Sequence, residues 1–376
     1  MSAPRSFELL VNPRHGVPGV TILPGGGFRR AKAAITAWPG YAATPLRDLP
    51  RTAAEAGVGI IRLKDESSRF GLGSFKALGG AYVVANVLAA EVSRAGLAQS
   101  ASSEDLAAGR FAAHTGGITV TCATDGNHGR SVAWGAGRFH CRCVIFVHEA
   151  VSQARVDAIA KYGAEVLRVA GNYDDAVREA DRQATRNGWF VVSDTSYPGY
   201  TEVPREVMQG YRLMADEAAD QWDGAPPTHV FMQAGVGGAA AAVSVQMRMR
   251  FTPTPLLVVV EPERAACLLQ SAKAGKATVV RGDLATIMAG LACGEPSLLA
   301  WQELERAAWA FMSIPDEAAA GSLRRLADDG IVIGESGVAG MVGLMAAAED
   351  FGAKKDLRLT RESRVLLFGT EGNTDR

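Results

Sequence analysis

Lys76 has a setting that suits a reactive amine better than a solvating charge. It follows two glycines and a serine in the segment 70–76, and it precedes an apolar run that predicts a helix over 76–92. If burial desolvated this lysine, its ammonium form would be disfavoured and its pKa would fall, which would make the amine a nucleophile toward an aldehyde. The segment alone leaves open a lysine in the first turn of a helix with its charge in water.

A glycine-rich turn further along the chain is suited to binding phosphate. The turn follows a predicted strand, opens an Ala-rich helix and consists of Gly235, Val236, Gly237 and Gly238. Successive backbone N–H groups and the helix N-terminus can therefore face an anion. The turn lacks the Lys-Ser/Thr pair of a P-loop and the full spacing of a dinucleotide fingerprint, which disfavours both of those ligands. A tight structural turn is the alternative.

Polar residues also follow other predicted strands. The turn 124–130 contains Asp125 and Asn127, and a later turn contains Asp194. A carboxylate at a strand end is a candidate acid or base, although a helix cap or an Asp-initiated turn would explain each one equally well. Thr370 follows the last predicted strand and supplies a hydroxyl group.

Together these features match the needs of pyridoxal 5′-phosphate. The cofactor's aldehyde requires a lysine, its phosphate requires a nest of N–H groups, its 3′-oxygen requires a donor such as an asparagine, and its ring nitrogen requires a partner. Each signal is weak by itself, but the combination predicts a pyridoxal-phosphate enzyme.

Short apolar strands alternate with helices along most of the chain. One group of strands is expected at 118–123, 143–147, 165–169 and 190–193, and others at 58–63, 230–232, 256–260 and 365–368. This alternation predicts an α/β fold with two open parallel-sheet domains, the smaller inserted in the larger. The expected boundaries are 1–80 and 205–376 for the large domain and 81–204 for the small one. Ligands bind beyond the carboxyl ends of such strands.

The composition describes an ordinary globular enzyme, with 48% hydrophobic and 21% charged residues among 376. A net charge of −1 does not suggest nucleic acid or an anionic membrane as partner, and no signal peptide or membrane span is expected. Five cysteines without a CxxC motif predict no metal site and fit the cytoplasm. Cys267 and Cys293 fall near segments expected to line the site; free thiols are favoured over a disulfide.

The chain resembles the tryptophan synthase β-like family of pyridoxal-phosphate enzymes, which have fold type II. The motifs at 74–76, 126–129 and 235–238 come in the family's order, and the resemblance extends from Tyr41 onward. Within the family, the segments 70–76, 123–130, 193–197, 286–296 and 370–375 are similar to those of diaminopropionate ammonia-lyases. Serine and threonine dehydratases typically have a Ser-Gly-Asn-like turn where this chain has a carboxylate, Asp125.

The resemblance implies a role for each candidate residue. Lys76 would hold the cofactor and exchange a proton on its side of the ring, and Asn127 would contact the 3′-oxygen. The turn 235–238 would bind the phosphate, and Thr370 would lie on the ring-nitrogen side. Asp125 and Asp194 would neutralise the second ammonium of the substrate, and one of them would take the Cα proton from the face opposite the lysine.

The activity that the resemblance implies is α,β-elimination of 2,3-diaminopropionate, in both D and L forms, to pyruvate and two ammonia. The implied partners are a small amino-acid substrate and a second copy of the chain in a homodimer. A serine/threonine dehydratase-like or cysteine-synthase-like enzyme is the alternative within the family. A catalytically silent binding protein on the same fold is the non-enzymatic alternative.

Overall fold

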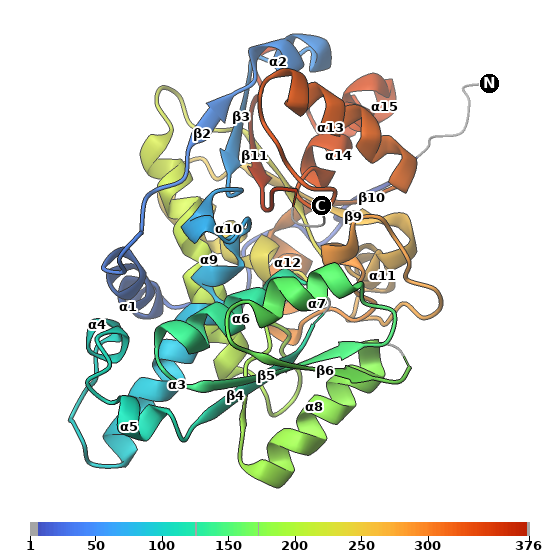
Figure 1. The fold of residues 1–376 in the computed structure, drawn as a ribbon. Helices are drawn as coiled ribbons and strands as arrows, with labels where there is room; N and C mark the ends of the chain where they lie inside the picture. Colours follow the sequence, from blue (N-terminus) through green and yellow to red (C-terminus); the bar gives the residue numbers. More distant parts are fainter. Residues whose placement is uncertain (1–6, 125, 172, 374–376) are drawn as a thin grey trace.

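Two β-sheets organise the protein (Figure 1). The structure is a computed structural model that describes residues 7–124, 126–171 and 173–373. The larger sheet has the strand order β1-β10-β9-β8-β11-β3-β2, and the smaller sheet has the order β6-β5-β4-β7. These two sheets, with helices packed around them, confirm the predicted α/β fold class.

The larger sheet has a parallel centre and two antiparallel edges. Its strands are β1 (Glu8–Val11), β2 (Leu46–Asp48), β3 (Ile60–Asp65), β8 (His229–Gln233), β9 (Leu256–Pro262), β10 (Ala308–Ile314) and β11 (Arg364–Gly369). The edge strands β1 and β2 pair antiparallel with β10 and β3, whereas the other pairs are parallel. The sequence did not predict β1, β2 or β10. The first two are very short, and β10 begins directly after a helix without a turn residue to mark its start.

The smaller sheet is parallel throughout, as predicted. It consists of β4 (Thr119–Ala123), β5 (Arg142–His148), β6 (Glu165–Val169) and β7 (Phe190–Val191). The helices α6 (Asn127–Arg138), α7 (Gln153–Ala160) and α8 (Tyr173–Asn187) connect these strands. All of these elements fall within 81–204, but the domain boundaries themselves stay a prediction.

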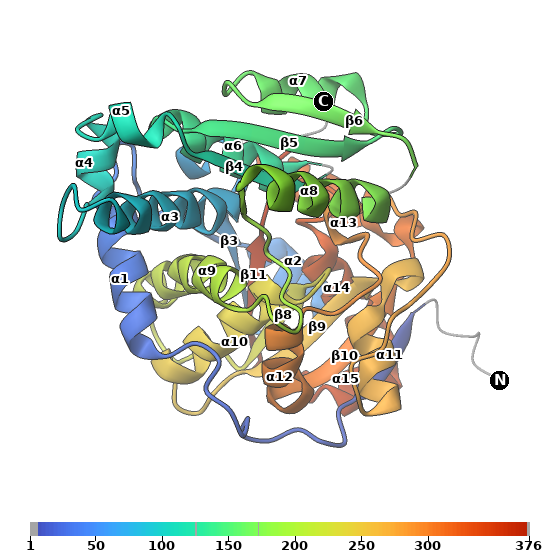
Figure 2. The same ribbon diagram turned by 90° about the horizontal axis from the view of Figure 1, so that it is seen from below.

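Most of the remaining α-helices pack around the larger sheet or between the two sheets, and two short ones pack on the helix 80–94. They are α1 (Gly25–Thr36), α2 (Pro50–Ala56), α3 (Gly80–Arg94), α4 (Ser103–Ala107), α5 (Ala112–Thr115), α9 (Glu202–Gln221), α10 (Gly238–Arg250), α11 (Cys267–Ala274), α12 (Leu298–Ala307), α13 (Ala319–Asp328), α14 (Ala339–Glu349) and α15 (Phe351–Asp356). Helix α3 packs on α6 and on α9, and Figure 2 shows α3 and α9 between the two sheets.

Two hydrophobic cores lie on opposite faces of the larger sheet. Successive residues of β11 alternate between them: Leu366 and Phe368 belong to one core, and Val365 and Leu367 belong to the other. This alternation follows from the period of two in a strand. The first core also contains residues of the smaller sheet, such as Val120. The two sheets are therefore joined by one continuous core.

The segment Phe75–Arg94 is long and apolar enough to cross a membrane by length and composition alone, although the sequence predicted no such run. In the structure, 67% of its most apolar window is buried inside the protein. It contains α3, whose inner face belongs to the core that joins the two sheets. Burial in that core explains why the segment is apolar.

The sequence predicted that Lys76 lies in the first turn of an α-helix, but the structure does not place it there. It lies in a 3-10 turn, Phe75–Leu78, and α3 begins only at Gly80. The middle of α9 packs against the backbone of this turn. A Cβ atom built on Gly210 would lie 1.8 Å from the Leu78 carbonyl oxygen, so only glycine permits this approach.

A buried network of charges fixes the segment that leads to Lys76. The Arg69 guanidinium makes two hydrogen bonds to the Glu66 carboxylate, both 2.8 Å, and two to the Glu217 carboxylate of α9, at 2.7 and 2.9 Å. Lys64 adds a second cation, with its Nζ 2.7 Å from Glu217 Oε2. All four side chains are at most 5% exposed. Two cations and two carboxylates thus balance in the interior, which avoids the cost of an unpaired buried charge.

Replacing Gly210 with alanine should destabilise the protein, because the added methyl group would overlap the Leu78 carbonyl. We expect the free energy of unfolding to fall by about 1 to 3 kcal/mol or more, measured by urea denaturation. The matched control is Gly321→Ala in α13, where the nearest atom to the new Cβ is 3.4 Å away on the flexible Arg325 side chain. That control should be neutral or stabilising by up to about 1 kcal/mol. Equal behaviour of the two variants would contradict the close contact.

Candidate active site

The Lys76 amine faces the Asp194 carboxylate. Lys76 Nζ lies 2.6 Å from Asp194 Oδ2, and both side chains are about one-fifth exposed, at 22% and 20%. The Tyr211 hydroxyl of α9 donates to the same oxygen at 3.5 Å. The rings of Phe75 and Tyr211 pack on each other, with centroids 4.6 Å apart, and both lie near the amine, with centroids 5.2 and 5.5 Å from Nζ.

This ion pair sets the charge of both groups. Burial alone would lower the pKa of Lys76, but the Asp194 carboxylate, with smaller contributions from Tyr211 and Cys293, outweighs it and raises that pKa. Burial alone would raise the pKa of Asp194, but Lys76 and, less strongly, His128 hold that pKa well below its usual range. The predicted fall in the pKa of Lys76 is therefore wrong for this arrangement, because the sequence did not reveal the carboxylate beside it.

His128 lies on the other side of Asp194. Its Nε2 is 2.7 Å from the Val192 carbonyl oxygen, and its Nδ1 is 3.8 Å from Asp194 Oδ2. Burial is the main cause that lowers the pKa of this imidazole, and the Lys76 ammonium lowers it further. His128 is therefore neutral near pH 7 in this arrangement.

The glycine-rich turn forms a cradle next to this pair. Gly237 has the positive φ of +95° that favours glycine, and α10 begins at the next residue. A Cβ on Gly235 would lie 3.0 Å from Cys293 Sγ, and one on Gly238 would lie 3.6 Å from the Asp194 carbonyl oxygen. Within the described part of the chain, the N–H groups of 235–238 donate to no other residue. They remain free to bind an anion at the helix N-terminus.

Asn127 reaches from the smaller sheet to the end of β11. Its Nδ2 donates to Glu371 Oε2 at 2.5 Å, and its Oδ1 accepts from Arg130 Nη1 at 3.3 Å. Glu371 Oε1 in turn accepts from the backbone N–H of Ser336 at 3.2 Å. These bonds fix the orientation of the Asn127 amide, and they leave one of its two Nδ2 hydrogens for a further acceptor.

Thr370 presents a hydroxyl whose proton is free to be donated. Its Oγ1 accepts a hydrogen bond of 2.8 Å from Gln233 Nε2, which also donates to the Phe368 carbonyl at 2.7 Å. Because Thr370 Oγ1 already accepts, its own O–H can point to an acceptor in the site. The backbone N–H of Phe75 donates to the Thr370 carbonyl at 3.1 Å, which ties this residue to the Lys76 turn.

The structure brings most of the predicted site residues together. Lys76 and Asp194 are in direct contact, the turn 235–238 is beside them, and Asn127 and Thr370 lie at the neighbouring end of β11. Asp125 lies outside the described residues. Cys267 and Cys293 form no disulfide with each other, as favoured from the sequence, and both lie next to Gly235.

Three residues of the site were not foreseen: Tyr211, Gln233 and Glu371. Nothing in their local spacing indicates a role. The one usable signal was Gly210, because a glycine inside a helical pattern often marks a close approach of two backbones.

These residues fit pyridoxal phosphate. A lysine within reach of a carboxylate, a glycine cradle with unpartnered N–H groups, an oriented asparagine amide and a hydroxyl with a free proton correspond to the four groups that the cofactor needs. They come from both sheets and lie beyond the carboxyl ends of their strands, where ligands of such folds bind.

Comparison with known proteins agrees with this assignment. The family described as "Pyridoxal-phosphate dependent enzyme" matches residues 37–360, most of the chain. The chain belongs to this family. It is also 42% identical to diaminopropionate ammonia-lyase of Escherichia coli over 350 residues, which cover 89% of this chain and 86% of that relative.

Solved structures of this family confirm the fold. The holo form of diaminopropionate ammonia-lyase from Escherichia coli superposes with a TM-score of 0.90 at 37% identity, covering 99% of this chain and 95% of that one. The same protein with an aminoacrylate–pyridoxal-phosphate azomethine intermediate gives a TM-score of 0.87 at 36% identity, with the same coverage. The predicted fold type II architecture and the predicted cofactor are thus confirmed.

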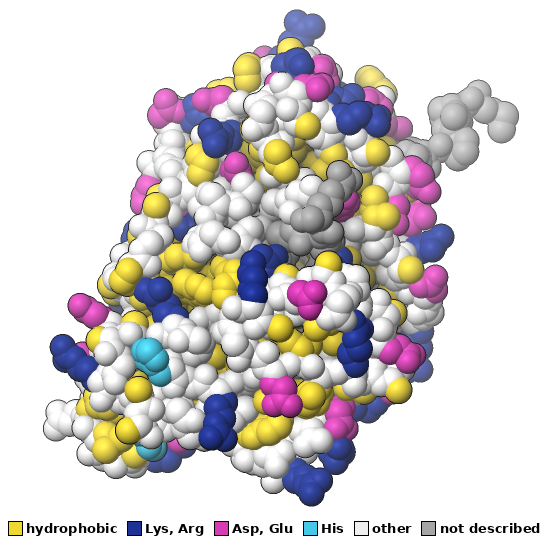
Figure 3. Space-filling view, in the orientation of Figure 1, with side chains coloured by type: hydrophobic (Ala, Val, Ile, Leu, Met, Phe, Trp, Pro, Cys, Tyr) yellow, Lys and Arg dark blue, Asp and Glu magenta, His cyan; other side chains and the backbone are white. Residues whose placement is uncertain are grey.

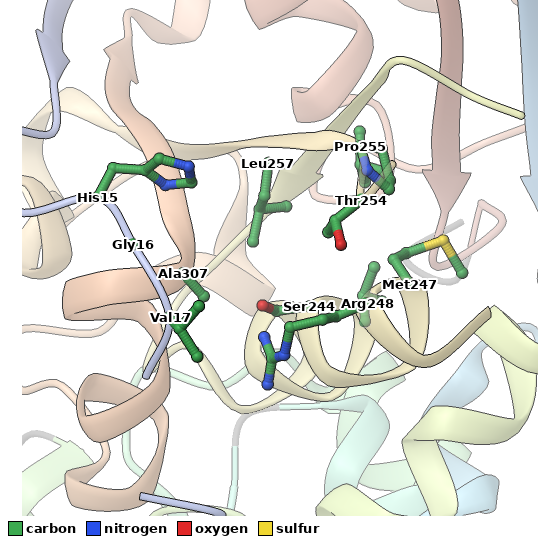
Figure 4. Close-up of a pocket in the computed structure, with 12 residues that line it drawn as sticks. His15, Gly16, Val17, Ser244, Met247, Arg248, Thr254, Pro255, Leu257 and Ala307 are labelled. Carbon is green, nitrogen blue, oxygen red and sulfur yellow. The ribbon is translucent and has the colours of Figure 1, made fainter. Parts of the chain in front are cut away.

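A second cavity lies at the other end of the larger sheet. It has a volume of about 200 Å³ and includes Val230 and Leu257, which lie near the starts of β8 and β9. Figure 4 shows His15 and Arg248 among the side chains around it. Lys76 and the cradle lie beyond the opposite ends of these strands, so this cavity is separate from the active site.

On the face shown in Figure 3, hydrophobic side chains gather across the middle of the molecule. This band lies between the parts built on the two sheets, and charged side chains are spread mostly around it and along the outer rim.

Glu261 is a fully buried carboxyl group at the end of β9, close to the cradle. Its two oxygens accept from the backbone N–H groups of Leu268 and Leu269 in α11, both at 2.8 Å. The adjacent Cys267 has its Sγ 3.6 Å from the Gly235 carbonyl. Burial raises the pKa of Glu261 to about 8, although the two N–H donors partly oppose it.

The stability of the protein should therefore depend on the ionisation of Glu261. Because its pKa in the folded state is above the unfolded value of 4.5, its contribution to stability is lost as the pH rises from about 5 to about 8. Glu261→Gln cannot ionise, so the free energy of unfolding of the wild type should fall relative to this variant by up to roughly 4 kcal/mol over that range. Urea denaturation at several pH values would measure this; parallel curves for the two proteins would contradict it.

Proposed function

We propose that this enzyme eliminates ammonia from 2,3-diaminopropionate to give pyruvate and two ammonia. The observation that carries the proposal is the 2.6 Å contact between Lys76 Nζ and Asp194 Oδ2, because it marks a largely buried carboxylate, 20% exposed, that binds a primary ammonium. The similarity to diaminopropionate ammonia-lyase over most of the chain supports the same substrate. Loss of the Cα proton and of the β-nitrogen leaves aminoacrylate, which water hydrolyses to pyruvate and the second ammonia.

Four groups of the chain would hold the cofactor, which supplies an electron sink for the carbanion at Cα. Lys76 would bind its aldehyde carbon, and the N–H groups of 235–238 would bind its phosphate. Asn127 would donate to the 3′-oxygen. Thr370 would donate to the ring nitrogen, and a neutral hydroxyl there leaves that nitrogen unprotonated, which suits elimination better than transamination.

Asp194 would favour substrates whose leaving group carries a positive charge. With its nitrogen bonded to the cofactor, Lys76 would no longer present to Asp194 the ammonium that it contacts in this structure. A carboxylate with little solvent access is stabilised by each cation that contacts it, so the β-ammonium of diaminopropionate would take the place of the lysine charge. A hydroxyl leaving group, as in serine, offers no such compensation.

Asp125 would act on the face of the substrate opposite Lys76. It stands two residues before Asn127 in the sequence, which supports a position close to the 3′-oxygen of the cofactor. With a lysine base on one face and a carboxylate on the other, the enzyme could take the Cα proton from both D and L isomers.

We further propose that the enzyme works as a homodimer in the cytoplasm. The five cysteines, all free thiols, fit a reducing compartment. The homodimer is the assembly expected from the family resemblance.

The proposed activity can be tested by measuring pyruvate release from D- and L-diaminopropionate beside D- and L-serine and threonine. Diaminopropionate should be turned over at least roughly tenfold faster, because only its leaving group pairs with Asp194. Lys76→Ala should lose both turnover and the visible absorbance of the bound cofactor. Lys161→Ala, which changes an exposed lysine, is the control and should keep both. Faster turnover of serine would favour the dehydratase alternative.

The two acidic residues should differ in their effects. Asp194→Asn should lower kcat/KM for both isomers of diaminopropionate by roughly 100-fold, since it removes one partner of a buried charge pair, and should affect serine much less. Asp125→Asn should damage turnover of one isomer selectively. Equal, small effects of Asp125→Asn on both isomers would exclude the assignment of a separate base to each face.

A further inference from the structure

Two buried histidines of this protein are anchored in the same way. His128 Nε2 lies 2.7 Å from the Val192 carbonyl oxygen, and His229 Nε2 lies 2.8 Å from the Leu357 carbonyl oxygen. A carbonyl oxygen only accepts, so Nε2 must carry the proton in both rings. In a neutral imidazole this leaves Nδ1 as an acceptor.

The two rings differ at Nδ1. His229 Nδ1 has a hydrogen-bond partner, the Thr228 hydroxyl at 2.7 Å. His128 Nδ1 is buried and has no hydrogen-bond partner among the described residues. Its nearest charged neighbour is Asp194 Oδ2 at 3.8 Å. A buried nitrogen without a partner is uncommon in folded proteins and requires an explanation.

The Lys76 ammonium explains this arrangement. An acceptor nitrogen beside a carboxylate is unfavourable unless a proton lies between them, and here the Asp194 carboxylate is already satisfied by Lys76 at 2.6 Å. The same ammonium opposes a positive charge on His128. With its nitrogen bonded to the cofactor, Lys76 would no longer present this ammonium to Asp194, and the repulsion that it exerts on His128 would be weakened.

We propose that His128 is a positioning residue for Asp194, and that its Nδ1 donates the hydrogen bond that holds this carboxylate whenever Lys76 is joined to the cofactor. The inference rests on the proposed function only for the assignment of Lys76 to the cofactor. The contact must shorten from 3.8 Å to about 3.2 Å or less. The Val192 carbonyl keeps the ring in place, so Asp194 is held at a fixed position for the substrate ammonium.

The surroundings leave few other groups that could play this part. Among the described residues, Asp194 and Lys76 are the charged side chains that act on His128. The other titratable groups on which Asp194 acts include the Tyr211 and Tyr200 phenols and the Cys122 thiol, and burial raises the pKa of all three, so they stay neutral. Of these groups, only the imidazole can gain a positive charge near neutral pH.

The proposal is tested by NMR titration of the full-length chain labelled at histidine, with the His128 signal assigned from its loss in His128→Asn. Removing the lysine charge with Lys76→Ala, without any cofactor, should raise the pKa of His128 by about 1 or more, since an opposite charge at this distance acts on that scale. The double variant Lys76→Ala/Asp194→Asn should return it to the wild-type value. His229 should titrate identically in all forms and reports that the fold is intact.

Each outcome of this experiment decides a separate point. An unchanged pKa of His128 in Lys76→Ala, or a rise that persists in the double variant, would overturn the proposal. If the alanine variant loses the His229 signal, Lys76→Met, which keeps the side-chain volume, is titrated in its place. Loading the wild type with pyridoxal phosphate should give the same rise as Lys76→Ala. A rise in the variant without one on loading would overturn the proposed role of His128 in the loaded enzyme, and the visible absorbance of the bound cofactor would report its attachment to Lys76 separately.

Discussion

The position of the Lys76 amine depends on one backbone contact, in which Gly210 of α9 lies against the carbonyl of Leu78. This approach is too close for any side chain, and it places two other residues of α9. Tyr211 reaches the amine and its carboxylate partner, and Glu217 neutralises Arg69 in the segment that leads to the lysine. Helix α9 thus fixes the position of the Lys76 amine, although it contributes no residue to the phosphate cradle.

The charged groups of the site face one another because they come from the two sides of the junction between the sheets. Lys76 precedes α3, whereas Asp194 and His128 come from the part built on the smaller sheet. A single core joins the two parts, so the charges that face each other across the junction are held at short distance with little water between them. In such a setting a carboxylate strongly prefers to have a cation beside it. The identity of that cation can change while the carboxylate stays in place.

Much of this organisation could be predicted from the sequence. Strands such as 165–169 are marked by their apolar runs and flanking turns, and the motifs around Lys76, Asn127 and Gly235 identify the cofactor because their residue types are needed together. The edge strand 8–11 has no such pattern. It has only four residues and pairs with one neighbouring strand, so its hydrophobic residues show no clear alternation. The raised pKa of Lys76 depends on Asp194, 118 positions away, and Glu371 accepts from Asn127, 244 positions away. Spacing along the chain does not encode such contacts.

The place of β11 in the larger sheet has a consequence for how the protein is made. This strand lies at the centre of the sheet, between β8 and β3, yet it follows both of them in the sequence. During synthesis the N-terminal parts emerge first, so the edges of β3 and β8 that pair with β11 stay exposed until β11 has emerged. Exposed edges are templates for aggregation. The nascent chain therefore needs protection of these two edges until β11 has emerged and paired with them.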